Sequence, residues 1–133
     1  MKRNTTLFTL LGALVLGTLV STLRPAAGQE PSYLADVRVV VDAYAAGLSS
    51  CDQAALAAYT TPPFLDRLRV RLSTCGQPGQ LGAFRRVQQE TTIEPDLVVV
   101  NLLWTQPDGV LELVPVAVKK EGGRWLVAGG AVP

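Results

Sequence analysis

An apolar hairpin near the C-terminus constrains the fold of this chain more than any other feature. Residues 97–106 read LVVVNLLWTQ and residues 110–120 read VLELVPVAVKK, with Asp108 and Gly109 between them. β-Branched and aromatic residues favour strands, and Asp-Gly is a strong signal for a two-residue turn between antiparallel strands. We therefore predict that the chain folds around this antiparallel strand pair.

A two-residue turn also predicts which side chains share a face of the pair. It places Trp104 opposite Leu113, and side chains then alternate between the two faces. One face suits a core and carries Val98, Val100, Leu102, Trp104, Leu111, Leu113 and Ala117. The other face carries the apolar side chains of Val99, Leu103, Val114, Val116 and Val118. Because a face this apolar is rarely left in water, we predict that these residues form an interface.

The remaining elements follow from periodicity and from helix-start signals. Apolar positions recur at helical spacing over residues 34–48, and shorter helices are expected over residues 54–59, after Asp52, and over residues 62–72. Strands are expected over residues 84–93 and 125–128. Pro115 predicts a bulge that bends the sheet. The predicted fold class is α+β, with about three N-terminal helices packed on a curved four-stranded antiparallel sheet.

The N-terminal residues 1–28 have the layout of an export signal. Lys2 and Arg3 precede an uncharged, largely apolar stretch, and the small residues Ala26 and Gly28 precede Gln29. This pattern predicts a secretory signal peptide cleaved before Gln29. The alternative is an uncleaved membrane anchor, which is the one case in which we expect membrane contact. In both cases residues 29–133 form one domain outside the cytoplasm.

Two cysteines, Cys51 and Cys75, are the only ones in the chain. In a small exported domain an even pair indicates a disulfide bond. Two free thiols in redox chemistry are the alternative, but they usually have a C-x-x-C spacing, which is absent here. We therefore predict a disulfide and an oxidising, extracytoplasmic location.

The composition excludes several classes of function. The chain has no histidine, so it has neither a Ser-His-Asp triad nor an imidazole metal ligand. Its net charge of +1 argues against a nucleic-acid partner, which would need a clustered basic surface. Asp36, Asp42 and Asp66 are expected to be solvated helix carboxylates. We therefore expect no catalytic residues, no metal site and no cofactor.

Several segments together resemble a known superfamily. They are DAYAAGLSSCDQAALAAY (residues 42–59), TPPFLDRL (61–68), PDG (107–109) and KKEGGRWLV (119–127). Their order is similar to that of the nuclear transport factor 2-like superfamily, whose members are cone-shaped α+β rolls with a cystatin-like arrangement. Within it, the chain looks most like exported actinobacterial proteins of the lumazine-binding-like and Mce-associated kind. The resemblance implies either an enzyme of the ketosteroid isomerase, polyketide cyclase or dehydratase type, or a non-catalytic binding module.

A pocket inside the cone would be lined by aromatic residues and one amide. The candidates are Tyr44, Tyr59, Phe64, Asn101 and Trp104. Such a pocket would take a small apolar ligand, whereas ordinary core packing of the same residues is the alternative. Asn101 is the one polar residue within LVVVNLLW (residues 97–104) and needs a hydrogen-bond partner if it is buried.

These observations predict an exported, non-catalytic binding or assembly domain of the cell envelope. The apolar sheet face predicts a homodimer, or docking on another envelope protein. The alternative is a small-molecule isomerase or cyclase with a pocket in the cone.

Overall fold

The computed structural model describes residues 30–73, 75 and 81–133. The chain divides into two units, Met1–Pro31 and Ser32–Pro133, and every described helix and strand belongs to the second unit. The predicted signal or anchor over residues 1–28 lies outside the described residues. None of the helices that the structure describes is long and apolar enough to cross a membrane.

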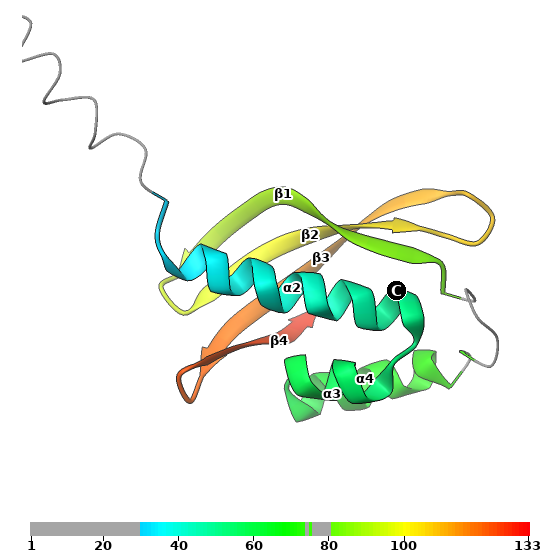
Figure 1. Ribbon diagram of the computed structural model, residues 1–133, viewed down its shortest axis with the longest axis horizontal. Helices are drawn as coiled ribbons and strands as arrows, with labels where there is room; N and C mark the ends of the chain where they lie inside the picture. Colours follow the sequence, from blue (N-terminus) through cyan, green and yellow to red (C-terminus); the bar gives the residue numbers. More distant parts are fainter. Residues whose placement is uncertain (1–29, 74, 76–80) are drawn as a thin grey trace, which may run out of the picture. The chain divides into compact units, whose positions relative to one another are not determined.

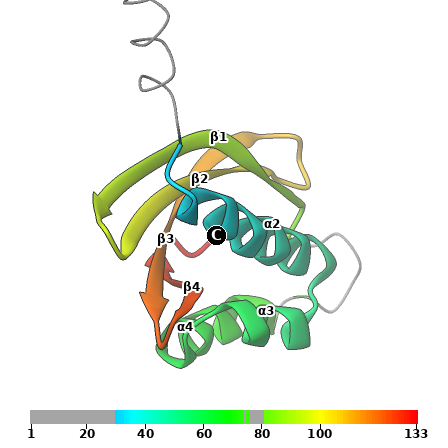
Figure 2. The ribbon, with the colours of Figure 1, turned by 60° about the vertical axis from the view of Figure 1, so that its left-hand side comes forward.

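The second unit has the predicted α+β architecture (Figure 1). Its helices are α2 (Tyr33–Ser50), α3 (Gln53–Tyr59) and α4 (Pro62–Leu72). Its strands are β1 (Ala83–Glu94), β2 (Leu97–Thr105), β3 (Leu111–Glu121) and β4 (Arg124–Gly130). They form one antiparallel sheet in the order β1-β2-β3-β4. The sheet is curved, α2 lies along its concave side, and α3 and α4 pack against β4 (Figure 2).

The helix starts are set by the residues that the sequence indicates. The Asp52 carboxylate accepts a hydrogen bond from the Ala55 amide at 3.1 Å and caps α3. Pro62 occupies the first turn of α4, where its missing N–H is not needed. The Thr61 amide donates to the Val127 carbonyl at 2.9 Å. The connection between α3 and α4 is therefore fixed to β4.

The core fills the space between the concave sheet face and the helices. Alternate residues of β2 and β3 supply the sheet side of this core, and one face of α2 together with α4 supplies the other. The fully buried larger side chains are Val37, Val41, Tyr44, Leu48, Leu56, Phe64, Leu68, Val98, Val100, Leu102, Val116 and Val118. At roughly 1.5–3 kcal/mol for each buried aliphatic or aromatic side chain, this layer is the main favourable contribution to folding.

The turn between β2 and β3 is one residue longer than predicted. The Gly109 amide donates to the Gln106 carbonyl, and the Gln106 amide donates to the Val110 carbonyl, both at 2.8 Å. The loop is therefore Pro107–Asp108–Gly109, with Gly109 at a φ of 86°. These hydrogen bonds and the left-handed glycine are those of a three-residue hairpin loop, which is usually built on a type I turn with proline favoured at its second position. The predicted two-residue turn is wrong because Pro107 belongs to the loop rather than to the strand.

The longer loop moves β3 by one residue and exchanges its two faces. Trp104 pairs with Glu112 rather than with Leu113. Val114, Val116 and Val118 consequently lie in the core, with exposed fractions of 3%, 0% and 0%. Their predicted place in an exposed interface is wrong. The β2 half of the prediction needs no correction, because Val98, Val100 and Leu102 are all buried and Val99 and Leu103 lie on the opposite face.

Pro115 does not cause the predicted bulge. It pairs regularly with Asn101, and the irregularity in β3 lies further along, between Ala117 and Val118 in the pairing with β4. The Pro115 carbonyl accepts a hydrogen bond from the Ala131 amide at 2.9 Å. The backbone N and O of Pro115 therefore point toward the C-terminal residues rather than toward β2. Proline is tolerated here because the regular ladder with β4 ends at Val116.

Candidate functional site

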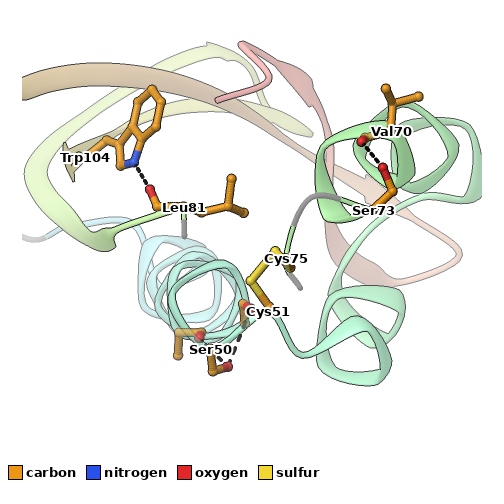
Figure 3. The surroundings of a disulfide bond; sticks show 9 residues. Ser50, Cys51, Val70, Ser73, Cys75, Leu81 and Trp104 are labelled. Atoms are coloured by element: carbon orange, nitrogen blue, oxygen red, sulfur yellow. Dashed lines mark hydrogen bonds between the residues drawn. A yellow bond between two sulfur atoms is a disulfide. The ribbon is translucent and has the colours of Figure 1, made fainter. Parts of the chain in front are cut away.

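The predicted disulfide is present and links the ends of two helices (Figure 3). Cys51 follows α2, Cys75 lies just beyond α4, and their Cα atoms are 6.1 Å apart. Cys51 has a φ of 53°, in the left-handed conformation that ends α2 and allows the chain to turn into α3. The bond is consistent with an oxidising, extracytoplasmic location.

The convex side of the sheet, here called the outer face, is apolar. Its apolar residues are Leu97, Val99, Leu103, Leu111, Leu113, Pro115, Ala117 and Leu126, and the polar Asn101 and Thr105 of β2 lie among them. Leu111 and Leu113 are 62% and 54% exposed. The three described helices pack on the other side of the sheet, so no described element covers the outer face. A continuous apolar surface of this kind marks an interaction site more often than a free surface.

Polar groups are sparse on the outer face and lie mainly at its edges. Arg85 and Thr91 on β1 pair with Leu103 and Val99 of β2, and Lys119 lies toward the other end of β3. Asn101 is near the middle, is half-buried, and makes no side-chain hydrogen bond within the described part of the chain. The pattern is that of an apolar centre with a polar rim.

The residues predicted to line one pocket are dispersed. Tyr44 and Phe64 contact one another in the core, with ring centroids 6.2 Å apart. Trp104 lies at the end of the sheet, where its ring stacks on Phe84 at 5.6 Å and its indole N–H donates to the Leu81 carbonyl (Figure 3). These three aromatic residues therefore contribute to packing, as the alternative to a ligand pocket predicts.

The other two predicted pocket residues lie elsewhere. Asn101 is on the outer face, opposite Pro115, and therefore points away from the concave side. Tyr59, at the end of α3, lines a surface pocket of about 290 Å³. The complete lining of this pocket is Asp36, Val39, Val40, Tyr59, Gly123, Arg124 and Trp125. The sequence does not indicate this pocket, because its walls come from α2, α3 and the turn that leads into β4.

A polar network joins α2 to β1 beside the core. Arg38 pairs with Glu90 at 2.6 Å, and Arg86 lies 2.8 Å from the Asp42 carboxylate and 3.6 Å from that of Glu90. The Asp42 carboxylate, which was predicted to be solvated, therefore pairs with the Arg86 guanidinium of β1. Each carboxylate in the network has a guanidinium partner, an arrangement suited to holding the helix on the strand.

Among the described residues, Tyr44 is the one with a buried side-chain polar atom that lacks a hydrogen-bond partner. Its hydroxyl is fully buried and has no hydrogen-bond partner within the described part of the chain. Burial raises the pKa of the Tyr44 phenol far above its usual value, so the group stays neutral at physiological pH. An unsatisfied buried hydroxyl destabilises the native state by about 1–3 kcal/mol.

Removing that hydroxyl is therefore expected to stabilise the protein. Tyr44→Phe keeps the ring contact with Phe64 and should raise the free energy of unfolding by about 1 kcal/mol. Urea denaturation followed by tryptophan fluorescence measures the change. Phe64→Leu is the matched control, because it shortens the other partner without touching a polar group, and it should lower stability. A less stable Tyr44→Phe variant would show that the hydroxyl is hydrogen-bonded.

The described residues contain no group of three or more side chains able to hold a metal ion. Comparisons of the chain with protein-family models, with curated proteins and with solved structures give no match. The resemblance to the nuclear transport factor 2-like superfamily therefore stays a prediction.

Proposed function

We propose that this protein is an exported, non-catalytic assembly domain of the cell envelope that pairs with a second copy through the outer face. The supporting observation is the exposure of Leu111 and Leu113 beside Val99 and Leu103, on a sheet whose helices all cover the opposite side. The envelope location rests on the predicted export signal and on the disulfide. The proposal replaces the predicted interface valines of β3 with the leucines that the longer turn exposes.

The size of the outer face suits a dimer of modest affinity. Neighbouring strands lie about 4.8 Å apart, and each strand rises about 3.4 Å per residue. A face of four strands, each about as long as the nine-residue β2, therefore has an area on the order of 600 Å². Two such faces would bury about 1,200 Å², the lower end of the range for specific protein pairs. We therefore expect a dissociation constant in the micromolar range.

The central amide favours a second copy as the partner. Asn101 would be buried by any protein that covers the outer face, and its donors and acceptor would then need partners. In a two-fold symmetric contact the same residue of each copy can meet near the axis. Because an amide has both donors and an acceptor, two Asn101 side chains can satisfy one another.

A charge on the outer face is expected to prevent this assembly. Leu113→Glu would place two carboxylates in the apolar contact and should weaken dimerisation at least about tenfold. Sedimentation velocity of the purified protein over a micromolar concentration series measures the effect. Val70→Glu is the control, since Val70 is 74% exposed on α4, away from the sheet. A wild-type protein that sediments as a monomer throughout the series would refute self-association.

A further inference from the structure

The surface pocket beside Tyr59 is separate from the outer face and has a different character. Its walls are the first half of α2, the last residue of α3 and the start of β4, on the helix side of the sheet. At about 290 Å³ it lies at the small end of the range for ligand sites. It is therefore large enough for a ligand of about the size of an amino acid or a dipeptide.

The apolar part of the lining is held in place by its neighbours. Trp125 stacks on Tyr33 with ring centroids 5.7 Å apart, and the Lys120 ammonium lies 6.0 Å from its ring centroid. Val39 lines the pocket and is 64% exposed, so its apolar surface is available for contact with a ligand. An apolar group bound between Val39 and Tyr59 would remove part of that exposure.

Two opposite charges line the same pocket without pairing with each other. Asp36 lies in the first turn of α2 and has no ion-pair partner within the described part of the chain. Arg124 donates one hydrogen bond, from Nη2 to the Ala58 carbonyl at 3.2 Å. A guanidinium has five N–H donors, so most of them stay available to a ligand.

We propose that this pocket binds a small zwitterion with an apolar body, such as a free amino acid with an apolar side chain. The ligand ammonium is bound by the Asp36 carboxylate, and the ligand carboxylate by the Arg124 guanidinium, whose fork suits a bidentate contact. The apolar body contacts Val39, Val40 and Tyr59. Each charge of the ligand adds its own ion pair, so a zwitterion binds more tightly than a ligand that carries only one of the two charges.

Three related probes test the proposal by nuclear magnetic resonance. L-phenylalanine has both charges, phenethylamine has only the cation, and hydrocinnamate has only the anion, on similar apolar bodies. Titration of the isotope-labelled protein up to about 20 mM should give saturable shifts of the Gly123 amide and the Trp125 indole with L-phenylalanine. Each single-charge probe should bind at least about fivefold more weakly. No saturable shifts with any probe, or equal binding of all probes, would overturn the proposal.

Variants assign the two charges separately. Asp36→Asn should weaken the binding of L-phenylalanine and of phenethylamine at least about fivefold and leave the binding of hydrocinnamate unchanged. Arg124→Gln should weaken the binding of L-phenylalanine and of hydrocinnamate and leave the binding of phenethylamine unchanged. The matched controls are Asp66→Asn and Arg69→Gln, a 3.0 Å ion pair on the exposed side of α4. Amide spectra show whether each variant keeps the fold. Probe affinities that neither pocket variant alters would overturn the assignment.

Discussion

Val116→Glu is expected to unfold the protein, whereas the same change at Leu113, three positions earlier in β3, leaves it folded. Val116 is fully buried and pairs with Val100 of β2, while Leu113 is 54% exposed. An unpaired carboxylate in the core should lower the free energy of unfolding by more than about 4 kcal/mol, a large part of the total for a small domain. At Leu113 the cost should stay below about 1 kcal/mol.

Circular dichroism and urea denaturation of the two variants measure this contrast, at protein concentrations low enough to keep the molecules monomeric. Leu113→Glu also serves as the control for expression and for the added charge. The two-residue turn predicts the opposite order, with Leu113 in the core and Val116 on the surface. A folded Val116→Glu variant beside an unfolded Leu113→Glu variant would therefore contradict the register of β3.

Loss of the disulfide is expected to have the second largest effect. Cys51 and Cys75 are separated by 24 positions, and in the chain-entropy description a loop of this length stabilises the folded state by about 3–4 kcal/mol. The double variant with alanine at both positions should lose about that much free energy of unfolding. Denaturant titration of the double variant and of the wild type measures the difference.

Reduction of the wild-type protein gives an independent value for the same quantity. If the bond acts mainly on the unfolded chain, the reduced wild type and the double alanine variant should have similar stabilities. Unchanged stability of both would show that the bond does not constrain the unfolded chain as expected.

The helices and strands were predictable because their signals are local. Asp52 and Pro62 mark helix starts by the hydrogen bonds that they satisfy or do not need, and both act as predicted. The alternation of β2 also predicts its buried face correctly. The disulfide was predictable from the even number of cysteines together with the predicted export signal.

The register of β3 was predicted wrongly, although the sequence contains the necessary information. Pro107 before Asp108 and Gly109 is typical of the three-residue loop that the structure has. Considering Asp108 and Gly109 alone shortens the loop by one residue, and an error of one residue is enough to exchange core and surface.

The surface pocket could not be predicted from local patterns. Asp36 lies on the first helix of the described unit and Arg124 at the start of its last strand, and only the folded sheet brings them to one pocket. Arg124 lies in the KKEGGRWLV segment, but nothing in that segment indicates a binding site, and Asp36 lies in none of the segments that carry the resemblance. The missing hydrogen bond of Tyr44 is likewise a property of the packed core, since a tyrosine at a helical core position has many ways to find a partner.

The apolar character of both faces of β3 has a consequence for how the chain reaches its native state. Leu111 and Leu113 on one face and Val114, Val116 and Val118 on the other are comparably hydrophobic, so burial alone discriminates weakly between the native pairing and one slipped by a single residue. Discrimination then depends on the hairpin loop, where Gly109 has a φ of 86° and the ring of Pro107 restricts its φ to the range that the turn needs. Changes to these two loop residues should therefore increase competition from a misfolded hairpin, in which the valines are exposed and prone to aggregation.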